Sequence, residues 1–220
     1  RQVEHAMRLR QRSPWARSLK WDDFCEYVLP YRVANEPILE EDSTWHIWQT
    51  AAQRLEAYGY EPKTMGEYKT LQRDLLEHTI DDARMKRLHT GLPGRATYSF
   101  ECLDRCYYEV SRLRAIGIPC AVDFVPGWPH RSGRHYWHMV LEPFYQNRNS
   151  SSEPLNARAA KIYRMTYSRQ PIPRPTEGET VPALFRSPFC RDVTNEYVQV
   201  SDVTCKVDGV SAQYAYLCIF

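Results

Sequence analysis

The stretch CLDRCYYEVSRLRAIGIPCAVDFVPGWPHRSGRHYWHMVL, residues 102–141, decides how this chain folds. Its first half carries apolar residues at helical spacing and follows segment 90–101, which has two glycines and a proline. Cys102 is therefore predicted to lie at or near a helix N-terminus. Gly117 and then Pro119 end the predicted helix.

Two strands are predicted after this helix. The run CAVDFVP is apolar and rich in β-branched residues. The residues of HYWHMVLEP alternate as expected for a strand with two different faces. Alternation places His135 and Trp137 on one face of the second strand and His138 on the other. A loop of glycine, proline and basic residues, 127–134, joins the two strands, so His135 is expected to open the second one.

A thiol at a helix start and an imidazole at a strand start are the parts of a cysteine nucleophile and its base. The unpaired amides and positive dipole of the helix N-terminus stabilise a thiolate and can also hold an oxyanion. An imidazole within reach of the thiol takes its proton, and the pair then rests as thiolate and imidazolium. The sequence thus predicts Cys102 as nucleophile and His135 as base.

Four linked elements in this region resemble the transglutaminase-like superfamily, whose catalytic core is papain-like. They are Cys102-Leu103-Asp104, Leu113-Arg114-Ala115, Gly117-Ile118-Pro119 and His135-Tyr136-Trp137. The order and spacing are similar to those of the family. The phrases FCEYVLPYRVANEP at 24–37 and AKIYRMTYS at 160–168 resemble a bacterial subgroup, so the resemblance extends over most of the chain.

The resemblance implies that Cys102 attacks a carboxamide carbonyl to form a thioester, and that His135 then protonates the leaving amine. Family members usually place an aspartate about fifteen residues after the histidine, whereas the segment EPFYQNRNSSSEP has none. Asn147 and Asn149 are the nearest substitutes, because an asparagine carbonyl can accept the imidazole N–H and fix its tautomer. Glu142 and Glu153 fit the spacing less well.

Other polar and aromatic residues have two interpretations each. Trp137 is a candidate substrate contact, although a core aromatic that shields the imidazole is the favoured interpretation. Arg32 either has a structural role or binds a substrate carboxylate. His138 is expected either to face solvent or to have a structural role. Cys106 is expected to be a thiol packed in the core. No C-x-x-C or H-E-x-x-H pattern supports a metal, and no cofactor is predicted.

Composition narrows the classes of partner. The 220 residues carry a formal charge of +2 with 25% charged residues, so nothing favours a nucleic-acid partner. No apolar run is long enough to span a bilayer, and these 220 residues contain no signal-peptide h-region, although a targeting segment could precede them. The seven cysteines form no evident disulfide framework. Because the chain starts at Arg1 without a methionine, we expect it to be a piece of a longer protein with further domains. Its localisation stays open, although the resemblance implies an exported or envelope protein for many relatives.

The predicted fold class is α+β, with a papain-like, transglutaminase-like core. Helices at 21–28, 43–58 and 64–88 form an N-terminal helical lobe, and an antiparallel sheet carries His135. The core and these helices occupy 1–170, and a linker covers 171–192. Short runs rich in tyrosine, valine and threonine, EYVQVSDVTCKV and QYAYLCIF, indicate that 193–220 begins an incomplete β-sandwich.

The function expected from these residues is acyl transfer at amide bonds of a peptide, protein or peptidoglycan-like substrate. Water as acceptor makes the protein a peptidase or amidase, and an amine makes it a transglutaminase. The alternative is a catalytically weak or inactive transglutaminase-like domain that binds peptide or glycan within a larger envelope protein. A purely structural domain, with Cys102 buried and unreactive, is the third hypothesis.

Overall fold

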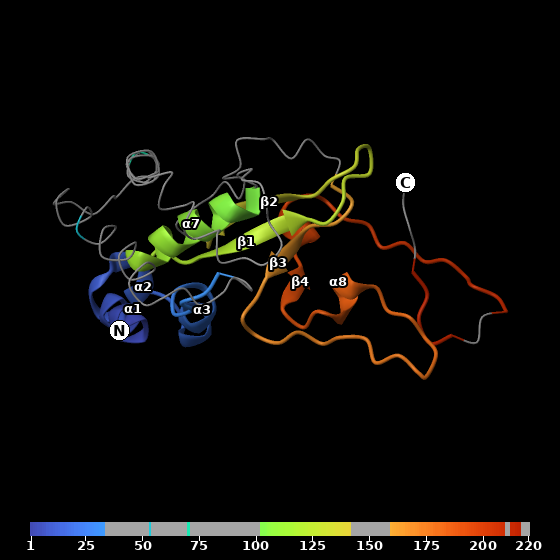
Figure 1. Ribbon diagram of the computed structural model, residues 1–220, viewed down its shortest axis with the longest axis horizontal. Helices are drawn as coiled ribbons and strands as arrows, with labels where there is room; N and C mark the ends of the chain where they lie inside the picture. The colour runs from blue at the N-terminus through green and yellow to red at the C-terminus, as the bar shows by residue number, and fades with distance from the viewer. Residues whose placement is uncertain (34–52, 54–69, 71–101, 142–158, 210–211, 217–220) are drawn as a thin grey trace, which may run out of the picture. The chain divides into compact units, whose positions relative to one another are not determined.

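The computed structural model describes residues 1–33, 53, 70, 102–141, 159–209 and 212–216 (Figure 1). These residues form helices and a four-stranded antiparallel sheet with strand order β2-β1-β3-β4, so the fold class is α+β. The chain divides into two compact units. Unit 1 is Arg1–Val122 with Tyr136–Ser152, and unit 2 is Asp123–His135 with Glu153–Phe220. None of the described helices has the length and apolar character needed to cross a membrane.

Three short helices begin unit 1: α1 (Gln2–Arg12), α2 (Pro14–Arg17) and α3 (Trp21–Tyr27). Ser13 separates the first two, and its side chain accepts a hydrogen bond from the backbone N–H of Ala16. The helix predicted at 21–28 is confirmed and ends one residue earlier than expected. The predicted helices at 43–58 and 64–88 lie outside the described residues, apart from single helical positions at 53 and 70.

The central helix of unit 1 is α7 (Cys102–Ala115), as the sequence predicts. It ends in a Schellman motif, in which the N–H of Ile118 bonds to the carbonyl of Leu113 and the N–H of Gly117 bonds to that of Arg114. Gly117 has a φ of 87°, and a Cβ there would lie 2.6 Å from Oγ of Ser13. Both the backbone conformation and the space require glycine at this position.

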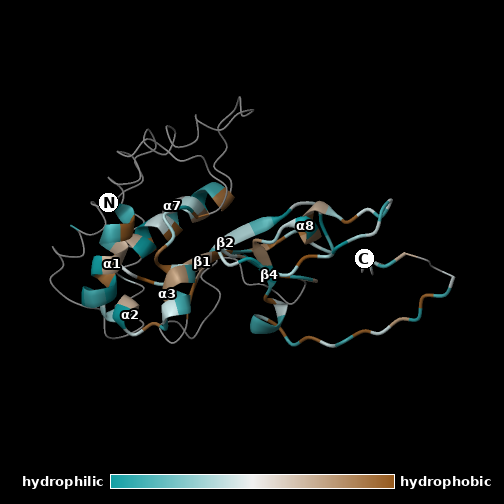
Figure 2. Cartoon of the chain, turned by 90° about the horizontal axis from the view of Figure 1, so that it is seen from below, coloured by the Kyte–Doolittle hydropathy of each residue, from teal (hydrophilic) through white to brown (hydrophobic). Residues whose placement is uncertain are grey.

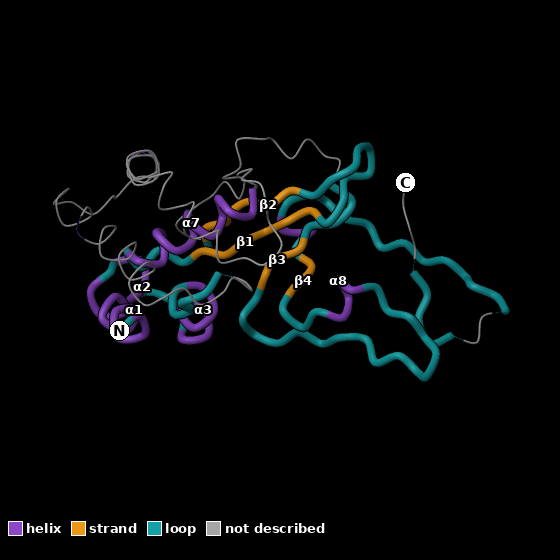
Figure 3. Tube along the Cα trace, viewed as in Figure 1, coloured by secondary structure: helices purple, strands orange, loops and turns teal. Residues whose placement is uncertain are grey.

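The strands are β1 (Cys120–Val125), β2 (His135–Val140), β3 (Tyr163–Met165) and β4 (Cys190–Asp192), drawn in orange in Figure 3. Asp123 of β1 pairs with Arg164 of β3, and Arg164 pairs with Arg191 of β4. β1 and β2 fall where the sequence predicts strands. The fourth lies in the segment expected to be a linker, because pairing with β3 makes a strand of only three residues that carries no sequence pattern.

The chain after β4 departs from the expected β-sandwich. Thr194–Glu196 is a 3-10 helix (η1), and residues 197–209 contain no strand, so the strands predicted there are wrong. The exposed Val203 and Val207 are four residues apart and would share a strand face, but Val200, three residues before Val203, would lie on the opposite face. Figure 2 shows short hydrophobic and hydrophilic patches following one another along this extended segment.

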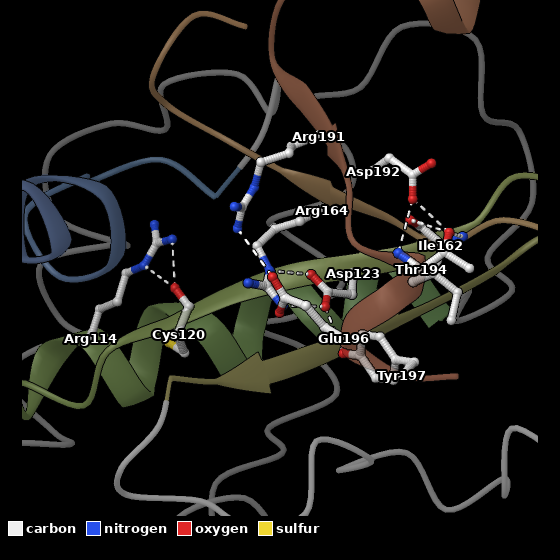
Figure 4. Close-up of polar contacts among 10 residues, drawn as sticks. All are labelled: Arg114, Cys120, Asp123, Ile162, Arg164, Arg191, Asp192, Thr194, Glu196 and Tyr197. Carbon is white, nitrogen blue, oxygen red and sulfur yellow. Dashed lines mark hydrogen bonds and ion pairs between the residues drawn. The ribbon is translucent and has the colours of Figure 1, made fainter. Parts of the chain in front are cut away.

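The guanidinium of Arg114, at the end of α7, is buried among backbone carbonyls. Its Nε and Nη2 donate to the carbonyl of Cys120 at 3.2 and 2.9 Å (Figure 4). Nε also donates to Tyr27, and Nη1 donates to Pro30 and Arg32, over 2.9–3.4 Å. One side chain therefore joins α7 to the start of β1 and to the chain that leaves α3.

A second buried arginine organises unit 2. Arg164 makes a bidentate pair with Asp123, at 2.8 and 2.9 Å, and also bonds to Glu196 at 2.9 Å (Figure 4). The hydroxyl of Tyr197 donates to the same aspartate at 2.6 Å. This network ties the segment around η1 to β1 and β3, so residues 194–197 fold onto the sheet.

Replacing Arg114 by methionine is expected to lower the free energy of unfolding by at least about 3 kcal/mol, because several buried carbonyls lose their donor. Arg114→Lys keeps the charge, but one ammonium cannot reach all four carbonyls, so it is also expected to destabilise. Urea unfolding measures both. The exposed Arg8→Ala is the control and should change stability by less than about 0.5 kcal/mol. A near-neutral Arg114→Met would contradict the role given to this side chain.

Candidate functional site

Cys102 is the first residue of α7 and is half-buried. A residue at this end of a helix lies next to backbone N–H groups that have no partner within the helix. Asp104 follows in the first turn with a buried side chain, and an acidic residue there favours the helix through its dipole. The predicted position of Cys102 at a helix N-terminus is confirmed.

The other thiols of this region differ from Cys102. Cys106, one helical turn later, is 2% exposed, so the predicted packed thiol is confirmed. Cys120 is fully buried in β1 and donates to the carbonyl of Val110. Burial raises the pKa of Cys120 to about 12, against the opposing influence of Arg114. The six described cysteines are all free, and Cys205 is exposed.

His135 is the first residue of β2, as predicted, and is half-buried. Its imidazole stacks on the indole of Trp128, with ring centroids 6.5 Å apart and planes at 30°. The guanidinium of Arg131 lies 4.9 Å from the same indole, and a backbone hydrogen bond from Trp128 to Gly133 closes the hairpin. The sequence did not single out Trp128, since only its place in the loop before His135 hints at the contact. Trp137 is buried.

A second imidazole lies in the interface between α7 and β2. Nδ1 of His138 donates to Oε2 of Glu109 at 2.5 Å, and both side chains are less than a tenth exposed. The structural role considered for His138 is therefore confirmed, and solvent exposure is wrong. Glu109 was missed from the sequence, although it lies seven residues after Cys102 on the helix face that also carries Cys106.

The remaining candidates are placed as follows. Asn147 and Asn149 lie outside the described residues. Arg32 is half-buried, and its backbone carbonyl accepts a hydrogen bond from Arg114. Among the residues that the structure describes, no three His, Cys, Asp or Glu side chains lie close enough together to hold a metal ion.

The charge of Glu109 depends on its partners. Burial acts to raise its pKa, but the hydrogen bond and charge of His138, followed by those of Arg105, bring the pKa below the ordinary value of 4.5. Arg105 bonds to Oε1 from the exposed side at 2.7 Å. A carboxyl whose pKa is lowered on folding contributes stability above its unfolded pKa, and that contribution is lost as pH falls through the folded pKa.

Glu109→Gln is therefore expected to lower the free energy of unfolding by about 1–3 kcal/mol at neutral pH, since it loses a charged hydrogen bond. The difference from the wild type should narrow as the pH falls below the ordinary carboxyl pKa of 4.5 and through the lower folded pKa, where the wild-type carboxylate takes up a proton. Urea unfolding across this range measures it. A difference that stays constant with pH would contradict an ionised Glu109 in the folded protein.

The chain was compared with protein-family models, with curated proteins and with solved structures, and none of them matches it.

Proposed function

We propose that this protein transfers acyl groups from amide bonds through a thioester on Cys102. The thiolate attacks the amide carbonyl, and the C–N bond breaks when His135 gives its proton to the leaving amine. Water then attacks the thioester, loses a proton to His135 and releases the acid, which regenerates the thiol. An amine in place of water would complete a transglutaminase reaction. Hydrolysis is the outcome we favour, on a peptide, protein or peptidoglycan-like amide.

The proposed framework is a papain-like, transglutaminase-like core. The order of helix α7, strand β1 and strand β2, with Cys102 and His135 each opening an element, supports it. In this framework Asn147 or Asn149 accepts the second imidazole N–H and fixes the tautomer. The oxyanion of the tetrahedral intermediate is stabilised by the backbone N–H of Cys102 at the helix start.

The observation that carries the proposal is the half-buried thiol of Cys102 at the first position of a 14-residue helix. In general, the backbone N–H groups and the positive end of the dipole at a helix N-terminus stabilise a thiolate. Cys102 is partly exposed, so a substrate can approach this residue. Cys106 and Cys120 are buried in the core, so we assign the reaction to the thiol of Cys102.

His135 has the setting that a base requires. It is half-buried, and Trp128 covers part of its ring, which limits the orientations open to the imidazole. An imidazole held in this way costs less entropy to bring into the reacting geometry. His138 bonds to Glu109 in the interface between α7 and β2, and His135, which opens the strand, is the histidine proposed for proton transfer.

Iodoacetamide at near-neutral pH is expected to alkylate Cys102 about tenfold faster than the exposed Cys205. A thiol of ordinary pKa near 8.5 is only a few per cent ionised at pH 7. A thiol that is fully ionised at this pH reacts faster, because its larger thiolate fraction outweighs the lower nucleophilicity of a thiolate of low pKa. His135→Ala should slow Cys102 towards the rate of Cys205 and leave Cys205 unchanged. Peptide mass mapping of the quenched reaction reads out each site separately.

Cys205 is the matched reference because it is more exposed than Cys102. A faster reaction at Cys102 then reports its ionisation and cannot come from easier access. Equal rates at the two sites, or a Cys102 that reacts only after denaturation, would contradict the proposal. That result would instead favour the transglutaminase-like domain without catalysis, which binds peptide or glycan.

A further inference from the structure

The buried pair of Glu109 and His138 is costly for a structure to keep. Both groups lie in the interface between α7 and β2, where their side chains are 7% and 6% exposed. Removing a carboxylate and an imidazole from water is repaid only by good mutual geometry, and an apolar pair of similar volume is often equally stable. Unlike apolar packing, a directional hydrogen bond of 2.5 Å fixes a single position of the helix on the strand.

The pair connects the two elements that carry the proposed reacting groups. Glu109 lies seven residues after Cys102 in α7, which is about 10.5 Å along the helix axis at 1.5 Å per residue. His138 lies three residues after His135 in β2, which is about 10 Å along the strand. Because each element is stiff over this length, a slide of α7 along β2 at the pair would carry the start of the helix with it.

We infer that Glu109 and His138 are positioning residues for the reaction at Cys102, because their hydrogen bond fixes α7, the helix that carries the thiol, on β2. This inference rests on the proposed function. A displacement of about 1 Å between reacting groups can cost about a hundredfold in rate, so a single register has a catalytic value that stability alone does not require.

The neighbouring contacts fix other degrees of freedom. The hydrogen bond from Cys120 to Val110 and those from Arg114 hold the second half of α7 on β1. The pair of Glu109 with His138 is a contact between α7 and β2 that has a defined donor and acceptor. Arg105 bonds to Glu109 as well, but both belong to α7, so their bond cannot hold the helix on the strand.

The test compares the effect of His135→Ala on Cys102 alkylation in two backgrounds, the wild type and the apolar pair Glu109→Met with His138→Leu. The apolar pair keeps the side-chain volume and removes the directional bond. In the wild type, His135→Ala should slow Cys102 about tenfold, and in the apolar pair about twofold or less. Thermal unfolding confirms that each protein is folded at the assay temperature. Arg105→Gln is the control and should keep the wild-type factor.

An apolar pair that unfolds at or above the wild-type temperature and keeps the full effect of His135→Ala would overturn the inference, because the bond would then serve stability alone. No effect of His135→Ala in the wild type would overturn the proposed function, and the inference with it. If the apolar pair does not fold, Glu109→Asp decides. Its carboxylate is one methylene shorter, so the inference expects a reduced effect of His135→Ala, and an undiminished one overturns it.

Discussion

Five hydrogen bonds from the buried guanidinium of Arg114 hold together three parts of unit 1 that are distant in sequence. They fix the end of α7, the start of β1 and the chain that leaves α3. A guanidinium suits this task because its five donors lie in one rigid plane and its charge persists at any ordinary pH. The position of α7, and therefore of Cys102 at its other end, depends on this anchor.

Among the described residues, three buried clusters of ionisable side chains fix helices and strands relative to their neighbours. Arg114 anchors the end of α7, the pair of Glu109 and His138 holds the helix on β2, and Arg164 with Asp123 joins β1 to β3 within unit 2. Buried charges are poor sources of stability compared with apolar packing, but their geometry is directional. Each cluster costs desolvation free energy and fixes one register between elements of the fold.

Much of unit 1 could be predicted because its signals are local. Helical spacing and the Gly117 stop predicted α7, and alternation predicted the parity that separates His135 from His138. Contacts between distant residues left no such trace, so neither the partner of His138 nor the stacking of Trp128 on His135 was foreseen. The segment after β4 was misread because its valines resemble strand residues, whereas Thr194 and Tyr197 bind it to the sheet through side-chain hydrogen bonds. The candidate third residues, Asn147 and Asn149, stay a prediction.

We propose that Cys102 accepts an acyl group with the help of His135. Treating the protein with p-nitrophenyl acetate and mapping the product by mass spectrometry tests this proposal. We expect one acetyl group on Cys102, removable by hydroxylamine, formed more slowly in His135→Ala and absent in Cys102→Ala. Acetylation spread over surface lysines or found at Cys205, with Cys102 unmodified, would contradict it.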